Sequence, residues 1–165
     1  MPKLVKNGEI VENDSWTLIQ DSDAKVESND LSDTIVPLEQ YLALESDVRD
    51  SQNIGIFLNN DCDLEAIDSA FLAAPIIAIN FPGFMDGRGF SLARMLRDTL
   101  DYKGTLRAVG YIIPDQLYYL GRCGFNEFSF DDDIEENTIV ECLHAFSNSY
   151  QAASDDPQPL FRRRA

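Results

Sequence analysis

A glycine-rich loop in the middle of the chain combines residues that could bind an anion. Arg88 can hold an oxyanion through two parallel hydrogen bonds, and Asp86 can orient that arginine or accept a proton. Gly87 and Gly89 let the backbone approach a ligand closely. The helix that we expect to begin near Ser91 would add N–H groups with partial positive charge. The loop therefore predicts a site for a small anion, although it defines no reaction.

The same loop has a purely structural interpretation. Its glycines would then only shape a tight turn between a strand and a helix, while Asp86 and Arg88 pair with each other in solvent. Neither of the glycine-rich patterns that bind nucleotide phosphates is present in the chain. A small anion is therefore favoured over a nucleotide as the ligand.

Several charged residues further along the chain would complete the pocket if the fold brings them to the same rim. Arg94 lies one turn into the expected helix, Arg107 lies in the next expected strand, and Arg122 follows that strand. Arg107 could instead be a charge at a sheet edge, and Asp115 could be a helix cap. The predicted anion-binding residues are Asp86, Gly87, Arg88, Gly89, Ser91, Arg94, Arg107, Asp115, Gln116 and Arg122.

The cysteines and the single histidine do not form a recognisable catalytic or metal-binding set. Cys62, Cys123 and Cys142 lie far apart, which disfavours a disulfide framework and the paired spacings of zinc or iron–sulfur sites. We expect Cys123 to be buried and inert, although the adjacent Arg122 would favour its thiolate. No nucleophile, base and orienting residue occur together, so the catalytic residues stay unassigned. No cofactor is evident.

The length and composition are those of one globular domain. At 165 residues the chain can bury about two-thirds of its unfolded surface, so it needs no disulfide or metal for stability. Its hydrophobic share of 44% is too high for a disordered protein. No run approaches the about 20 apolar residues that span a bilayer, and the N-terminus lacks a signal-peptide stretch. We therefore expect a cytoplasmic protein without a membrane partner.

The charge of the chain is unevenly distributed. The formal net charge is -16, and residues 1–75 carry 16 acids against 4 bases. Residues 76–125, in contrast, carry 6 bases against 4 acids. A chain this acidic is repelled by nucleic acid at long range. The central arginines therefore suit a small oxyanion, or an acidic patch on a protein partner, and no nucleic acid is expected as a partner.

Apolar runs and helix-spaced apolar residues alternate from residue 36 onward, as in an α/β protein. The expected strands are 54–58, 76–81, 106–112 and 127–130, and the expected helices are 38–44, 64–73, 92–100, 115–123 and 134–150. Residues 1–35 are interpreted as a peripheral hairpin, with a turn at Asn7-Gly8, followed by an acidic loop. Residues 36–150 form the expected α/β domain, and residues 151–165 form an extended tail.

Strands that are apolar on both faces predict a mostly parallel sheet covered by helices. Four βα units could form an open doubly wound sheet or half of a (βα) barrel. We favour the open doubly wound sheet, because half a barrel exposes apolar edges unless it dimerises. In both arrangements ligands bind beyond the carboxyl ends of the strands, where the loop 82–90 would lie.

The tail combines apolar and basic residues in an extended, proline-stiffened segment, a form typical of docking peptides. The predicted partner-docking residues are Leu160, Phe161, Arg162, Arg163 and Arg164. In the alternative, the tail is a solvated terminus whose arginines only offset the local acidic charge.

Several of these motifs, taken in order, also carry a family resemblance. They are Phe84-Met85-Asp86-Gly87-Arg88-Gly89-Phe90-Ser91, Leu106-Arg107-Ala108-Val109-Gly110, Asp115-Gln116-Leu117, Arg122-Cys123-Gly124-Phe125 and Pro159-Leu160-Phe161-Arg162-Arg163-Arg164. Together they resemble a family of uncharacterised bacterial proteins encoded beside sulfite reductase and often labelled as oxidoreductases of sulfite reduction. The resemblance covers about residues 35–164.

This resemblance implies a cytoplasmic role in sulfate assimilation, at the sulfite reduction step of cysteine biosynthesis. Our first hypothesis is an accessory protein that binds a small oxyanion and docks to sulfite reductase through its tail. The second is an oxidoreductase that acts in sulfite reduction with an unidentified cofactor. The third is a dimeric structural protein without a ligand, and association into a homodimer is left open.

Overall fold

The chain forms one eight-stranded sheet in the computed structural model, which describes residues 3–21, 31–66, 69–130 and 134–163. The strands are β1 (Lys3–Lys6), β2 (Glu9–Val11), β3 (Thr17–Leu18), β4 (Thr34–Pro37), β5 (Ile54–Leu58), β6 (Ile76–Phe81), β7 (Thr105–Gly110) and β8 (Glu127–Phe130). Their order across the sheet is β2-β1-β8-β7-β6-β5-β4-β3.

The strand order identifies a half-barrel. From β3 to β8 neighbouring strands are parallel and follow the order of the chain, while β1 and β2 add an antiparallel pair beyond β8. A doubly wound sheet needs a point at which the strand order reverses, and this sheet has none. The α/β class and the half-barrel alternative are therefore confirmed, and the open doubly wound sheet that we favoured is wrong.

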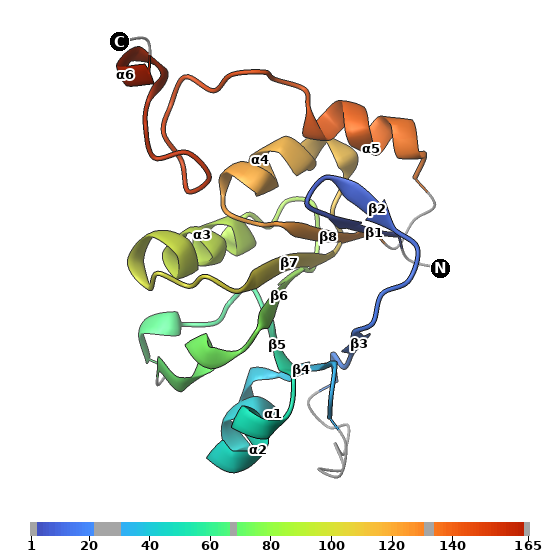
Figure 1. Cartoon of the computed structure of the whole chain (residues 1–165), viewed down its shortest axis with the longest axis vertical. Coiled ribbons are helices and arrows are strands. Elements are labelled where there is room, and N and C mark those ends of the chain that lie inside the picture. Colours follow the sequence, from blue (N-terminus) through green and yellow to red (C-terminus); the bar gives the residue numbers. More distant parts are fainter. Residues whose placement is uncertain (1–2, 22–30, 67–68, 131–133, 164–165) are drawn as a thin grey trace.

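The helices follow the strands along the chain. They are α1 (Leu38–Ala43), α2 (Ser46–Ser51), α3 (Arg88–Arg94), α4 (Leu117–Arg122), α5 (Glu136–Leu143) and α6 (Leu160–Arg163). The short turns are η1 (Leu64–Ala66), η2 (Ser69–Ala73), the π-helical η3 (Met95–Thr99), which continues α3, and η4 (Pro114–Gln116). Right-handed connections between sequential parallel strands put the helices on one face of the sheet, and α1, α3 and α4 lie together there (Figure 1).

Alternate residues of the strands build a core on each face of the sheet. The larger core lies under the helices and includes Ile77 and Ile79 of β6 with Leu92 of α3. The smaller core lies on the opposite face, where Trp16 and Leu18 pack against buried residues of four strands. Those buried residues are Ile35, Phe57, Ile76, Ala78 and Val109. The N-terminal part of the chain thus packs on the second face of its own half-barrel.

The N-terminal hairpin forms and extends the sheet. Lys6 pairs with Glu9 across the expected turn, where Asn7 and Gly8 both have positive φ angles, of 50° and 86°. Both angles suit the two-residue turn that matches the twist of a hairpin. β1 also pairs with β8, so the hairpin protects an edge of the parallel sheet.

The strands agree better with expectation than the helices do. Strands 54–58, 76–81 and 127–130 are confirmed residue for residue. The expected strand 106–112 is instead Thr105–Gly110, because Gly110 turns the chain with a φ of 88°. A Cβ atom at that position would lie 2.6 Å from the Phe81 carbonyl oxygen, so the turn needs glycine.

Three of the expected helices differ from those that form. α3 begins at Arg88, so Ser91 lies inside the helix and does not start it. In place of the expected helix 134–150, the chain forms the shorter helix α5, which ends at Leu143. In place of the expected helix 64–73, the described residues form the two 3-10 turns η1 and η2. Among the described residues, no helix is long and apolar enough to cross a membrane.

Candidate anion-binding cleft

A cleft of about 450 Å³ lies between α3, α4 and the chain that follows α5. Its lining residues are Arg94, Tyr118, Tyr119, Arg122, Cys123, Phe146 and the segment 148–153. Leu117 and Leu120 anchor α4 to the core, because both are fully buried. The cleft brings together two of the arginines that were predicted to bind an anion, Arg94 and Arg122.

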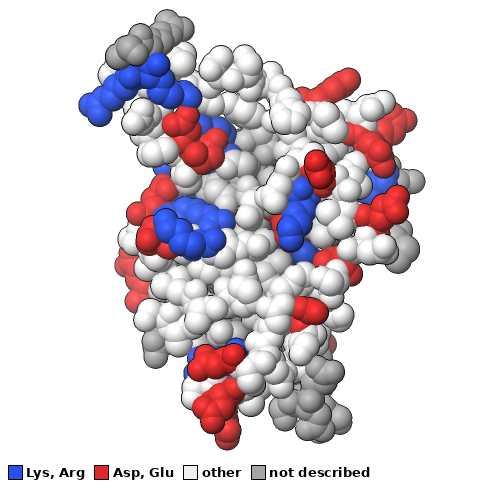
Figure 2. Space-filling view, viewed as in Figure 1, with Lys and Arg blue, Asp and Glu red and all other residues white. Residues whose placement is uncertain are grey.

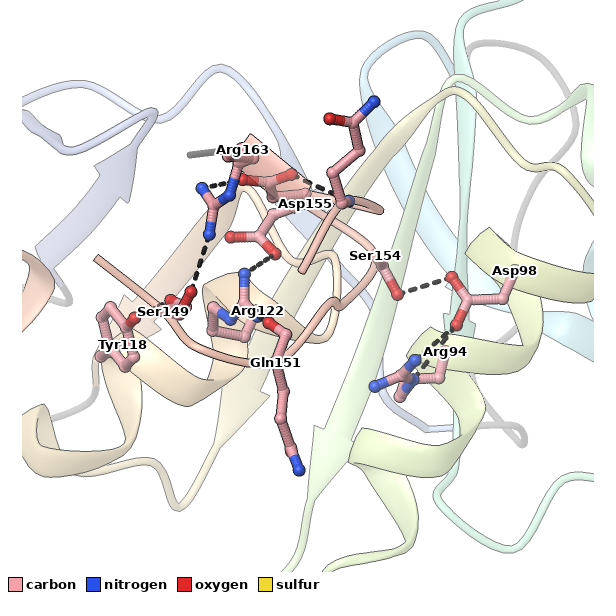
Figure 3. Close-up of polar contacts among 11 residues, drawn as sticks. Arg94, Asp98, Tyr118, Arg122, Ser149, Gln151, Ser154, Asp155 and Arg163 are labelled. Atoms are coloured by element: carbon pink, nitrogen blue, oxygen red, sulfur yellow. Dashed lines mark hydrogen bonds and ion pairs between the residues drawn. The ribbon is translucent and has the colours of Figure 1, made fainter. Parts of the chain in front are cut away.

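Arg122 already holds a carboxylate of its own chain. Its guanidinium donates a 2.5 Å hydrogen bond to Asp155 and a second bond to the carbonyl oxygen of Gln151 (Figure 3). The arginine is buried, and the backbone N–H of Ser154 donates to its carbonyl oxygen at 3.2 Å. Charge-assisted bonds of this kind are the ones that recognise carboxylates and other oxyanions.

Arg94 is connected to the same segment through Asp98. The Arg94 guanidinium donates bonds of 3.1 and 2.9 Å to one carboxylate oxygen of Asp98. The Ser154 hydroxyl donates a 2.7 Å bond to the other oxygen (Figure 3). Asp98 therefore links α3 to the chain beyond α5.

Aromatic side chains form the rest of the cleft wall. The Tyr118 ring meets Phe146 at a centroid distance of 4.9 Å, and its hydroxyl shares a hydrogen bond with Ser149. The Tyr119 ring meets Phe90 at 5.1 Å. The cleft wall beside the two guanidinium groups is therefore largely aromatic.

Cys123 contributes an inert thiol to the cleft. The side chain is fully buried, as expected from the sequence, and burial raises the pKa of the thiol above its ordinary value. The pKa of Tyr119 is also raised, mainly by the neighbouring Cys123. A protonated thiol is a weak nucleophile, so Cys123 is not an activated thiol in this structure.

The glycine-rich loop takes the structural interpretation instead. Arg88 donates bonds of 3.0 and 2.6 Å to the two carboxylate oxygens of Asp86, and the Arg88 side chain is 60% exposed. Asp86 also accepts the backbone N–H of Arg88, so it fills the position of an anion at the start of α3. Gly87 caps α3, and Gly89 packs so closely on Phe81 that a Cβ atom would lie 2.6 Å from its ring.

Arg107 lies on the opposite face of the sheet from α3. It donates to Glu127 at 2.9 Å and to both oxygens of Asp14 at 2.6 and 3.1 Å. Glu127 also pairs with Lys6 at 3.0 Å. The expectation that Arg107 and Arg88 converge on one rim is therefore wrong, because alternation along β7 directs Arg107 to the smaller core.

The last two predicted site residues lie beside the cleft. Asp115 lines an adjoining cavity of about 340 Å³, which shares Tyr118, Tyr119 and Phe146 with the cleft. The Gln116 side chain accepts the backbone N–H of Ile113 at 3.2 Å and so caps η4. Of the ten predicted residues, the fold therefore gathers Arg94 and Arg122, with Asp115 nearby.

The predicted docking residues belong to a folded segment. Leu160–Arg163 form α6, which lies at one end of the molecule (Figure 1). Arg163 donates to the Asp156 carboxylate and, at 2.7 Å, to the Ser149 carbonyl oxygen. Phe161 is 61% exposed. Arg164 lies outside the described residues.

The polar residues of this network that were not predicted include Asp98, Ser154 and Asp155. Asp98 could have been found, since it follows Arg94 at the i,i+4 spacing of helical ion pairs. Nothing in the sequence pairs Asp155 with Arg122. Within the described stretches, no group of three or more His, Cys, Asp or Glu side chains could hold a metal ion.

Comparison with known proteins gives a family for the chain. Neither the curated proteins nor the solved structures include a match. One family model matches residues 55–161, which span the sheet from β5 onward, the cleft and the first two residues of α6. The chain therefore belongs to DUF934, a family described as bacterial proteins of unknown function.

Proposed function

We propose that the protein is an accessory protein of assimilatory sulfite reduction, in the service of cysteine biosynthesis. It binds a small oxyanion in the cleft between α3 and α4, and it docks to sulfite reductase through α6. The resemblance of the central and terminal motifs supports the pathway. The arrangement of α6 supports the docking.

The observation that carries the proposal is the chemistry of the α6 tip. Phe161 is exposed, and the Arg162 guanidinium lies 5.8 Å from the centre of its ring. Figure 2 shows basic side chains gathered at the end of the molecule where α6 lies in Figure 1. On a chain with a net charge of -16, this basic and aromatic tip suits an acidic groove with an apolar pocket.

The oxyanion part of the proposal is supported by Arg94 and Arg122. Both line one cleft, and both already bind carboxylate oxygens. Sulfite offers three oxygens to such guanidinium groups, as a carboxylate offers two. The Arg88 loop is not proposed as the site, because its arginine is largely exposed and pairs with a carboxylate only two residues away in the same loop.

Docking is tested with the purified chain and sulfite reductase from the same bacterium, by biolayer interferometry. Removing an exposed aromatic anchor weakens binding when that anchor enters a pocket on the partner. We expect Phe161→Ala to raise the Kd at least about tenfold. Phe84→Ala is the matched control, because Phe84 is 54% exposed but lies in the loop after β6.

Two results would contradict the proposal. Absence of binding between the wild-type chain and the reductase would reject the partner. Equal weakening by Phe161→Ala and Phe84→Ala would reject α6 as the docking element.

A further inference from the structure

The segment 149–163 is a small folded unit of its own. The backbone N–H of Leu160 donates to the Tyr150 carbonyl oxygen at 3.0 Å. Arg163 bonds Asp156 and the Ser149 carbonyl oxygen, and Ala153 donates to the Asp156 carbonyl oxygen at 2.9 Å. These contacts join the two ends of the segment, so we expect α6 and residues 149–159 to move together.

Polar contacts fasten this unit to the rest of the chain. The partners on the body are Tyr118, Asp98 and Arg122, which hold Ser149, Ser154 and Asp155 (Figure 3). The aromatic side chains of the unit, Tyr150 and Phe161, are both largely exposed and bury little apolar area. Polar contacts rather than buried apolar area therefore hold the unit in place, and a ligand that replaces the Asp155 carboxylate at Arg122 would offset the loss of the strongest of them.

Release of the unit would leave the Arg122 site incomplete. The buried guanidinium would lose both the Asp155 carboxylate and the Gln151 carbonyl oxygen. The freed guanidinium donors would then face the opened cleft, so an external oxyanion would be favoured in the vacated position. Arg94 would keep its bond to Asp98, which would lose only Ser154.

We infer that Asp155 occupies an oxyanion-binding site in cis, and that release of the segment 149–163 opens this site at Arg122. This inference rests on the proposed function, because the oxyanion that it admits is the ligand proposed for the cleft. If the reductase binds the released segment more tightly than the attached one, partner docking and oxyanion binding favour each other. The covered site explains why Arg122 is paired within the isolated chain.

Sulfite binding to the full-length chain tests the inference by calorimetry at constant ionic strength. We expect Asp155→Ala to raise the affinity for sulfite at least tenfold over wild type. Arg122→Gln in the Asp155→Ala background should return the affinity to the wild-type level. Asp156→Ala is the matched control, since Asp156 bonds Arg163 and leaves the Arg122 contacts intact, and it should give no gain.

Circular dichroism confirms that each variant is folded. Should Asp155→Ala unfold, Asp155→Asn removes the charge with little change of shape and should give the same direction. No gain in sulfite affinity for a folded Asp155 variant would overturn the inference.

The same variants separate this inference from the proposed function. If the reductase binds the wild-type chain but Asp155→Ala binds sulfite no better, the inference fails and the docking stands. If Asp155→Ala gains sulfite affinity but no variant binds the reductase, the covered site stands and the proposed partner fails. Tighter reductase binding by Asp155→Ala than by Asp156→Ala supports both.

Discussion

Asp14 and Arg107 are 93 positions apart in the sequence, and Arg107 donates hydrogen bonds to both carboxylate oxygens of Asp14. Asp14 precedes Trp16, which packs on the smaller core, and Arg107 lies in the middle of β7. The ion pair thus fastens the N-terminal segment across the face of the half-barrel opposite α1, α3 and α4.

Loss of Arg107 should destabilise this face. Arg107 is only 3% exposed and serves two carboxylates, so Arg107→Met leaves Asp14 without its partner and Glu127 with Lys6 alone. We expect the free energy of unfolding to fall by about 3 kcal/mol in urea titrations. Trp16 is the single tryptophan, so its fluorescence reports on the segment directly. An unchanged unfolding curve would show that apolar packing alone fixes the segment.

The parallel core was predictable from the sequence because its signals are local. The runs 54–58 and 76–81 are apolar on both faces, which is typical of strands covered on both sides. The favoured open doubly wound sheet was wrong because the covering of the second face depends on Trp16, far away in the sequence. Spacing between strands carries no information on that contact.

The site was predictable only in part, for the same reason. Composition placed cations in the central third, and Arg94 and Arg122 do share a cleft. Whether these arginines are free to bind a ligand depends, however, on the carboxylates that they contact within the chain. The carboxylate that Arg122 contacts, Asp155, lies 33 positions later in the sequence. Asp86 is the instructive opposite case, because its bond to Arg88 is local and was foreseen as an alternative.

Arg97 is a structural cation, and its replacement should weaken the fold. Its guanidinium donates to the carbonyl oxygens of Gly124, Tyr102 and Gly104, at distances from 2.6 to 3.0 Å. Burial lowers the pKa of Arg97, so these bonds offset an unfavourable environment. We expect Arg97→Met to cost about 2 kcal/mol of unfolding free energy. Arg94→Met, which breaks an exposed pair, should cost much less in the same denaturant titration.

The Asp86–Arg88 pair predicts a titration behaviour. The hydrogen bonds that the Arg88 side chain donates are the main reason why the pKa of Asp86 lies far below its ordinary value. Stability from such a pair is present above the unfolded pKa, about 3.9, and is lost as the pH falls through the folded pKa. In carboxyl NMR titrations, Arg88→Gln should raise the pKa of Asp86 toward the ordinary value. Arg94→Gln is the control, and an unchanged Asp86 midpoint in Arg88→Gln would contradict the pairing.

Cys123 should report release of the segment 149–163. In the wild-type chain the thiol is buried and its pKa is raised, so iodoacetamide at pH 8 should modify it slowly. Asp155→Ala should admit water to the cleft and accelerate modification of Cys123, as measured by mass spectrometry. Cys62, whose thiol pKa is raised by burial and by acidic neighbours, lines a separate cavity at β4 and β5 and should not change. Opening of the cleft alone should raise the modification rate of Cys123 and leave that of Cys62 unchanged. An equal rise in the modification rates of both cysteines would indicate general unfolding and would contradict release of the segment.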